Sequence, residues 1–151
     1  MSQLTYRDDK TIAVWVKDKL DQENEIDFEK YTAIGVETDK HKLIAGLVFH
    51  DFRRKQRTIS ITMAATNPMW ATHKNLKDLL GYPFLQLNVF KIWIATRFEN
   101  KHALKTFKHI GFTQEAVLAH QFGPKKHCVM QRMLKNDYLK KYGDKDEKFS
   151  T

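Results

Sequence analysis

The sequence has a single cysteine and no long apolar run, and both features exclude classes of protein. Cys128 is the only cysteine among 151 residues, so an intramolecular disulfide and a cysteine-based metal cluster are both excluded. Its apolar neighbours, Val129 and Met130, favour a buried thiol over a reactive one. No apolar run approaches the roughly 18 residues that a membrane span needs. We therefore expect no transmembrane helix.

The beginning of the chain also lacks a targeting signal. Residues 1–9 include charged side chains where a signal peptide would need an apolar stretch, so we expect a cytoplasmic protein. A hydrophobic content of 42% in 151 residues is enough for one packed core. We expect residues 1–142 to form a single domain and residues 143–151 to form a charged, frayed tail.

Positive charge is in excess. The formal net charge is +8, and a field of that sign attracts nucleic acid, anionic lipid or a polyphosphate cofactor. The basic residues are spread along the chain, with local densities at residues 53–57 and around Lys101, Lys105 and Lys108. No helix-turn-helix, RNA-binding motif or aromatic-interleaved basic stripe is present. Nucleic acid is therefore a less favoured partner, with the basic turn at residues 53–57 as its best candidate contact.

Hydrophobic periodicity predicts a helix followed by three strands. Asp8 and Asp9 offer a helix cap, and apolar residues then recur at helical spacing to about residue 22. A polar connection at residues 21–29 has room for a short second helix. Residues 31–37 and 42–52 then alternate with a period of two and predict an antiparallel hairpin. In the next strand, residues 57–65, polar and apolar side chains alternate between the two faces.

The second half alternates helices and strands. Asn67-Pro68 predicts a helix start, and the helical spacing continues through Pro83, with a kink expected at residues 81–83. A strand at residues 90–96 follows. Asn100 then begins a short helix that Gly111 ends. Strands at residues 112–122 and 127–134 complete a mixed α/β order, with a helical crossover between parallel strands.

Several short motifs in this order resemble those of one superfamily. They are Asn100-x-x-Ala103 followed by Gly111-Phe112-x-x-Glu115, and the runs at residues 46–50, 68–72 and 82–84. Over residues 31–134 the chain resembles the GNAT (Gcn5-related N-acetyltransferase) superfamily. It is most similar to the branch of the ribosomal-protein N-acetyltransferases and to small GNAT-like proteins of phages and proteobacteria. The resemblance implies a central mixed sheet of six to seven strands flanked by helices.

The resemblance also implies acetyl-CoA as co-substrate. Exposed N–H groups at a helix start, together with the helix dipole, suit the pyrophosphate of CoA. In the family this turn reads Arg/Gln-x-x-Gly-x-Gly/Ala, whereas here the aligned positions are Thr66, Met69 and Ala71, without the basic residue and the first glycine. The expected cofactor-binding residues are Met63, Ala65, Met69, Trp70, Ala71, Thr72, His73, Asn100, Ala103 and Lys105.

The catalytic candidates differ from the family pattern. The position of a family tyrosine holds Phe107, which cannot donate a proton, and Ser60 stands near the place of a carboxylate. His50 has a suitable ordinary pKa for a general base, and Ser60 could orient a water. His120 and His127 are weaker candidates. The seven histidines show no metal-ligand spacing, so no metal site is expected.

Two functions fit these observations. The first is an N-acyltransferase that moves acetyl from acetyl-CoA to a primary amine, on a small molecule, a protein N-terminus or a lysine, by direct attack. The second is a catalytically inactive GNAT-fold module that binds protein or nucleic acid; the resemblance to small phage proteins is compatible with a phage origin. A monomer and a homodimer are both compatible with the sequence.

Overall fold

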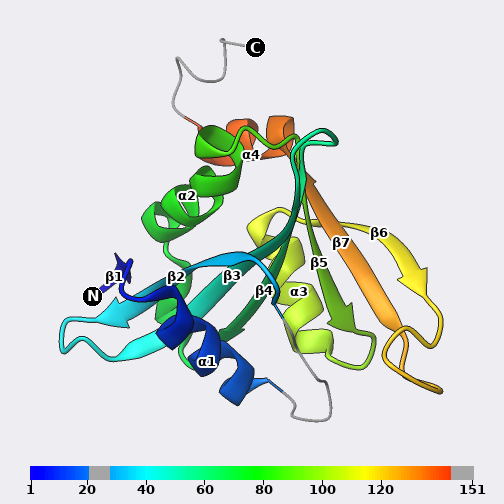
Figure 1. Cartoon of the computed structure of the whole chain (residues 1–151), viewed down its shortest axis with the longest axis horizontal. Coiled ribbons are helices and arrows are strands. Elements are labelled where there is room, and N and C mark those ends of the chain that lie inside the picture. Colours follow the sequence, from blue (N-terminus) through cyan, green and yellow to red (C-terminus); the bar gives the residue numbers. More distant parts are fainter. Residues whose placement is uncertain (21–27, 144–151) are drawn as a thin grey trace.

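The computed structural model describes residues 1–20 and 28–143 of the chain. In these residues seven strands form one mixed sheet in the order β1-β2-β3-β4-β5-β7-β6 (Figure 1). The strands are β1 (Ser2–Thr5), β2 (Tyr31–Thr38), β3 (Leu43–Arg53), β4 (Thr58–Ala65), β5 (Lys91–Arg97), β6 (Thr113–Leu118) and β7 (Cys128–Leu134). The helices are α1 (Asp9–Lys19), α2 (His73–Gly81), α3 (Lys101–Ile110) and α4 (Lys135–Tyr142). The expected α/β class and strand number are confirmed.

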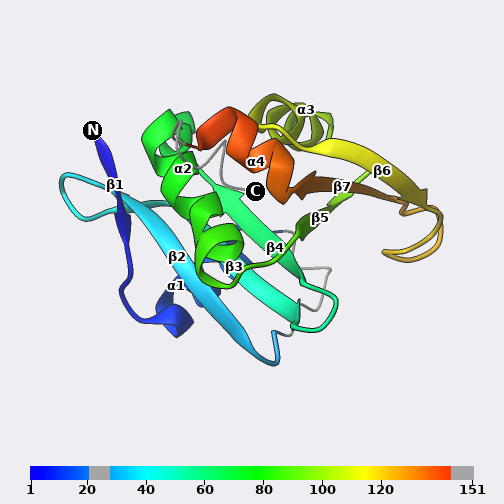
Figure 2. The ribbon, with the colours of Figure 1, turned by 90° about the horizontal axis from the view of Figure 1, so that it is seen from above.

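The helices form two unequal layers. Seen from above, α1 lies below the sheet, while α2, α3 and α4 lie on the opposite face (Figure 2). The larger core fills the space between the sheet and these three helices, and the smaller core lies under α1. Burial of apolar side chains on both faces is the main stabilising contribution to this arrangement.

The hairpin and the third strand form as their periodicity predicts. β2 pairs with β3 and β3 pairs with β4, both antiparallel. Ile59, Ile61 and Met63 of β4 face the larger core. The alternate residue Ala64 faces the smaller core, as strand geometry requires.

The first helix packs directly on a strand glycine. Asp8 caps α1, since its carboxylate accepts from the Lys10 N–H at 3.3 Å. A Cβ at Gly46 of β3 would lie 2.6 Å from Val16 Cγ2, closer than atoms can approach. Glycine is therefore needed at this position because α1 rests on it.

The expected long helix from residue 67 is interrupted twice. Asn67 and Pro68 begin a single 3-10 turn, Pro68–Ala71, and α2 starts only after Thr72, whose hydroxyl accepts from Asn75 N at 3.1 Å. The expected kink is a π-helical turn at Tyr82–Gln86. Pro83 has no N–H to donate within the helix. The backbone continues past it as a π-helical turn, in which the Leu87 N–H donates to the carbonyl of Tyr82, five residues earlier, at 3.2 Å.

Two elements were not predicted. The strand β1 has only four residues and pairs with the edge of β2, which leaves too little pattern to detect. The helix α4 is held by two buried tyrosines: Tyr138 donates to the Lys77 carbonyl at 2.7 Å, and Tyr142 donates to the Ile110 carbonyl. These bonds attach α4 to both α2 and α3.

Some expected boundaries change. The strand expected over residues 112–122 ends at Leu118, because His120 adopts a positive φ of 55° in the turn that follows. Most of residues 21–29, where a short second helix is expected, lies outside the described residues. The tail from residue 144 lies wholly outside them. None of the described helices is long and apolar enough to cross a membrane.

Candidate active site

A split between two parallel strands organises the candidate site. β4 and β5 pair only over Thr58–Ser60 and Lys91–Trp93. Beyond this point β4 remains paired with β3, and β5 with β7. The sheet therefore divides into two halves at the carboxyl ends of β4 and β5 (Figure 1). In a sheet with crossovers of this kind, ligands commonly bind where neighbouring strands diverge.

A small apolar pocket of about 10 Å³, within the larger core, lies on the α2 and α3 side of this split. Every lining side chain is apolar, and the lining comes from both halves of the sheet and from both helices. The residues are Leu47, Ile61, Met63, Trp70, Leu76, Leu80, Ile94, Phe107, Ile110 and Phe112. Of the expected cofactor residues, Met63 and Trp70 therefore line the pocket, whereas Ala65 is exposed at the end of β4. Phe107, which the resemblance aligns with a family tyrosine, contributes an apolar wall.

The turn before α2 uses part of its own hydrogen-bonding capacity. The Asn67 side chain accepts from Met69 N at 2.9 Å, and the Asn67 carbonyl accepts from Trp70 N at 3.3 Å. The two helix-start amides that geometry leaves without an intrahelical acceptor are those of His73 and Lys74. The Met69 and Trp70 amides are therefore used within the turn itself.

The side chains of this turn are unequally placed. Trp70 is buried and Ala71 is half-buried, whereas Met69 and Thr72 are exposed. The His73 ring lies 5.2 Å from the Tyr142 ring of α4, so its side chain is directed toward α4. The Ser2 hydroxyl at the chain start donates to the Met69 carbonyl at 2.8 Å and fixes the turn against β1.

The start of α3 is formed as the motif predicts. Asn100 caps the helix, since its side chain accepts from Ala103 N at 3.2 Å. Ala103 packs against the larger core, while Lys105 is exposed. The Lys101 ammonium lies 3.5 Å from the centroid of the Phe98 ring. Asn100 therefore has a structural role that is visible without any ligand.

The opposite side of the split carries the catalytic candidates. His50 of β3 and Ser60 of β4 are direct cross-strand partners. The Ser60 hydroxyl donates to the Trp93 carbonyl at 3.3 Å, at the last paired position of the parallel ladder. His50 Nε2 lies 2.7 Å from Thr62 Oγ1. The structure thus brings His50 and Ser60 together and adds Thr62, which the sequence reasoning did not include.

Burial makes His50 suited to the neutral state. Its ring is half-buried and lies 4.9 Å from the Phe28 ring. Loss of solvation lowers its pKa, and the neighbouring Asp51 carboxylate opposes this only in part. A neutral imidazole carries one lone pair that can accept a proton. His50 is therefore the described side chain near the split whose protonation state fits a general base.

The pocket and the imidazole share one strand. Ile61 and Met63 line the pocket, and Thr62 between them turns to the opposite face, toward His50. Successive strand residues point to opposite faces, so the two features are separated by the thickness of β4. Molecules that approached from the two faces would meet at the split.

The two remaining histidine candidates have structural contacts. His120 Nδ1 accepts from Lys125 N at 2.8 Å, and His127 Nδ1 accepts from His120 N at 2.9 Å. Their rings lie 4.8 Å apart in the turn between β6 and β7. Both side chains therefore stabilise this turn, and neither is brought to the His50–Thr62 pair by any described contact.

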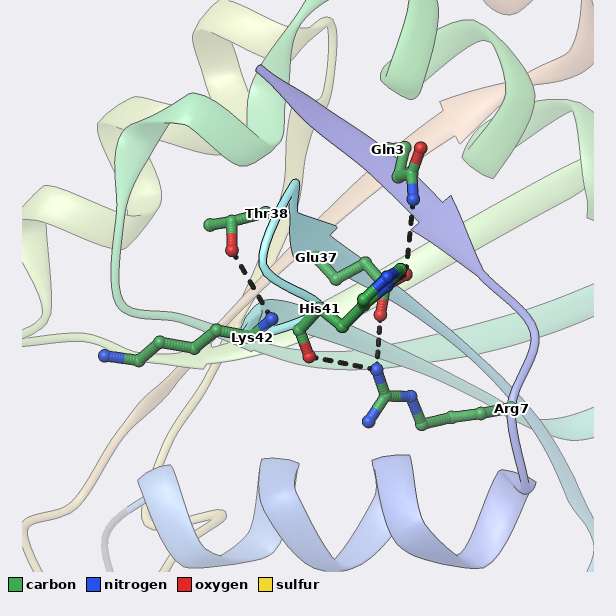
Figure 3. A network of polar contacts seen from close by, with 6 residues as sticks. All are labelled: Gln3, Arg7, Glu37, Thr38, His41 and Lys42. Carbon is green, nitrogen blue, oxygen red and sulfur yellow. Dashed lines mark hydrogen bonds and ion pairs between the residues drawn. The ribbon is translucent and has the colours of Figure 1, made fainter.

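A second polar cluster at the far end of the β2–β3 hairpin was also missed. Glu37 is only 5% exposed and forms an ion pair with Arg7 (Figure 3). It also contacts His41 Nδ1 at 3.1 Å and Gln3 Nε2 at 3.3 Å. The hydrogen bond from His41 and the two other donors lower the Glu37 pKa, against the effect of burial. We call this group the Glu37 cluster; its signal in the sequence was an acidic residue at the end of the apolar strand at residues 31–37.

Comparisons with known proteins support the fold. The structure is similar to spermidine N-acetyltransferases from Vibrio cholerae. A mutant of that enzyme matches with a TM-score of 0.75 and 15% identity, over 91% of this chain and 96% of that chain. Mutant forms of the spermidine/spermine N-acetyltransferase match with a TM-score of 0.74 and 16% identity, over 93% and 98% of the two chains. A dodecameric structure of the enzyme matches with a TM-score of 0.72 and 17% identity, over 91% and 96%.

These matches establish the class of fold. The chain has the GNAT fold, as its motifs implied. No family model matches the sequence, and the search of curated proteins finds no match. Within residues 1–20 and 28–143, no group of three or more histidine, cysteine, aspartate or glutamate side chains is placed to hold a metal ion.

Proposed function

We propose that this protein is an N-acyltransferase that moves acetyl from acetyl-CoA to a primary amine by direct attack. The single observation that carries the proposal is the β4–β5 split, with an apolar pocket on one face and the His50–Thr62 pair on the other. A two-substrate transfer needs donor and acceptor held in contact, and a divided sheet provides a place where they can meet.

The donor would lie on the pocket side. The pantetheine arm would run beside α3, from the region of Asn100 and Ala103 toward Met63, and the amides of His73 and Lys74 would face the pyrophosphate. Lys105 would supply positive charge in place of the missing basic residue of the turn. Beyond Ser60, β4 pairs with no strand on the β5 side in the part of the chain that the structure describes, so alternate amides up to Ala65 would be available to polarise the thioester carbonyl.

The acceptor would approach on the other face, where His50 takes a proton from the attacking amine. The amine nitrogen then forms a bond to the thioester carbon, and the carbon–sulfur bond to CoA breaks. Thr62 would hold the imidazole in place through the 2.7 Å contact. Ser60 is already bonded to the Trp93 carbonyl, so we assign it a supporting role. Phe107 excludes an acid from the position of the family tyrosine.

The acceptor class rests on the neighbours alone. The similar structures are spermidine N-acetyltransferases, which supports a small-molecule primary amine over a protein N-terminus or lysine. One neighbour is dodecameric, while a monomer or homodimer is what we expect for this chain. We also propose a cytoplasmic location, without a membrane partner.

The test is release of free CoA from acetyl-CoA with spermidine, or with a peptide bearing a free N-terminus, as acceptor. We expect acceptor-dependent release by the wild-type protein and loss of release in His50→Gln. The matched control, His109→Gln, changes an exposed histidine on α3 and should keep full activity. Equal activity in both variants would refute the assignment of His50, and acetyl-CoA binding without release for any amine would leave the binding-module function.

A further inference from the structure

Most of the net charge lies on three helices of one layer. α2, α3 and α4 together carry eight lysines and two aspartates, whereas α1 on the other face carries three lysines and two aspartates. The three helices therefore account for +6 of a total of +8. Their lysines are Lys74, Lys77, Lys101, Lys105, Lys108, Lys135, Lys140 and Lys141. We call the outward side of α2, α3 and α4 the basic face.

Contacts at Tyr142 bring the ends of the three helices together. Its hydroxyl donates to the Ile110 carbonyl at the end of α3, and its ring lies 5.2 Å from the His73 ring at the start of α2. Lys141 donates to the His109 carbonyl. Lys74, Lys108 and Lys140 are exposed beside these contacts, so cations from three separate segments are gathered in one region.

Helix ends alone do not explain this charge. Lysine is favoured near a helix carboxyl end, and α1 also has Lys17 and Lys19 there. However, α1 carries two aspartates beside its three lysines, whereas α3 has three lysines and no acidic residue. Depletion of acidic residues, which the helix dipole does not require, marks the basic face.

The basic face is also without apolar anchors. The exposed large hydrophobic side chains of the described residues all lie outside α2, α3 and α4. Protein–protein interfaces depend on buried aromatic and aliphatic anchors, and single-stranded nucleic acid depends on exposed aromatic rings for stacking. A polar surface rich in lysine matches instead the phosphate backbone of a duplex, which is bound through charge.

We propose that the basic face binds the phosphate backbone of a nucleic-acid duplex without reading its sequence. Contact with about four phosphates would make the affinity fall on the order of 100-fold between 50 and 200 mM salt. The contact differs from the basic turn at residues 53–57, which the sequence alone favoured. Lys105 and the Lys74 amide also belong to the proposed cofactor site, so the test rests on Lys108 and Lys140, to which no role in acyl transfer is assigned.

The test is fluorescence anisotropy with a mixed-sequence duplex of DNA and with the same duplex of RNA. The double variant Lys108→Glu/Lys140→Glu should weaken binding at least tenfold. The matched control, Lys10→Glu/Lys40→Glu, makes the same charge change at exposed positions away from the basic face and should weaken binding less than threefold. Circular dichroism melting of each variant verifies that it is folded.

Four results from the duplex measurements would overturn the proposal, and a fifth comes from acetyl-CoA binding. They are equal losses in the two double variants, an affinity that salt does not change, equal binding of poly-glutamate, and loss of binding only in Arg54→Glu/Lys55→Glu. Acetyl-CoA binding by Lys108→Glu/Lys140→Glu, measured in parallel, separates this surface from the cofactor site. If that variant loses acetyl-CoA and the duplex to the same extent, the lysines serve the cofactor and the duplex proposal fails.

Discussion

Glu37 and His50 lie on adjacent strands of one hairpin, yet their surroundings differ in kind. Glu37 is almost fully buried and has Arg7, His41 and Gln3 as partners. His50 is half-buried, and Thr62 is its hydrogen-bond partner in the described part of the chain. The oxygens of the Glu37 carboxylate are engaged with these donors, so this group stabilises the fold. An imidazole with a free nitrogen and a lowered pKa keeps its capacity for proton transfer.

The comparison separates stability from catalysis. Removal of the buried Glu37 carboxylate, which has three partners, should lower the free energy of unfolding without affecting kcat. Removal of the His50 imidazole should lower kcat with little effect on the free energy of unfolding. The Glu37 cluster joins β1, the segment before α1 and the β2–β3 turn (Figure 3). In the sheet order β3 separates β1 and β2 from β4.

The largest expected effect is on catalysis at His50. We expect His50→Gln to reduce kcat by about 100-fold or more, the usual contribution of a general base. The melting temperature should change little, because the ring has few partners. Steady-state kinetics and thermal melting of the same preparation measure both. A large drop in melting temperature with kcat preserved would show that His50 stabilises the fold and does not act in catalysis.

The second effect is on stability at Glu37. Glu37→Ala should lower the free energy of unfolding by about 2–3 kcal/mol, because three donors lose a charged acceptor. Below the new melting temperature kcat should equal that of the wild type. Urea unfolding gives the free energy, and Asp39→Asn, at an exposed ion pair of 3.7 Å, is the control with about 0.5 kcal/mol or less. Loss of activity in folded Glu37→Ala would show that the Glu37 cluster also affects catalysis.

The two groups should also differ in pH dependence. The pKa of Glu37 is lowered in the folded state, so its contribution to stability is complete above the ordinary value of 4.5 and is lost as the pH falls below it. The pKa of His50 is lowered from 6.5, so activity should persist below pH 6.5 and fall only at more acidic pH. The pH profile of kcat at a saturating amine concentration, to which ionisation of the free amine does not contribute, measures the effect at His50. The pH profile of the free energy of unfolding measures the effect at Glu37. An activity limb above pH 6.5 would exclude His50 as the base.

The smallest expected effect concerns Thr62. Thr62→Val keeps the side-chain shape and removes the hydroxyl that contacts His50 Nε2. Loss of one hydrogen bond, about 1 kcal/mol, corresponds to about a fivefold decrease in kcat if it positions the imidazole. The acid limb of the pH profile should shift as well, which a purely structural role would not cause. An unchanged kcat and limb would show that His50 needs no positioning by Thr62.

The sequence predicted much of the fold because its patterns are local. Alternation in β2, β3 and β4 and the caps at Asp8, Asn67 and Asn100 each depend on residues a few positions apart. The strand β1 escaped prediction because its four residues gain their stability from pairing with β2 residues that lie 30 to 36 positions away in the sequence. Such pairings are tertiary and leave no periodic signal.

The site was predictable only in part for the same reason. His50 and Ser60 could be selected by residue type, and their contact follows from hairpin register. Thr62 required the diagonal relation between β3 and β4, and Glu37 required the approach of Arg7 from another segment. The Tyr142 contacts that gather the lysines of three helices also depend on tertiary packing.

Thermal unfolding with acetyl-CoA tests the central claim most directly. If the β4–β5 split holds the cofactor with a Kd of about 10 μM, 1 mM acetyl-CoA stabilises the folded state by about 2.7 kcal/mol. The melting temperature should then rise by about 5 °C or more, and Ala71→Trp, which blocks the turn before α2, should abolish the rise. No shift at millimolar acetyl-CoA would contradict the assignment of this site and of the acyltransferase function.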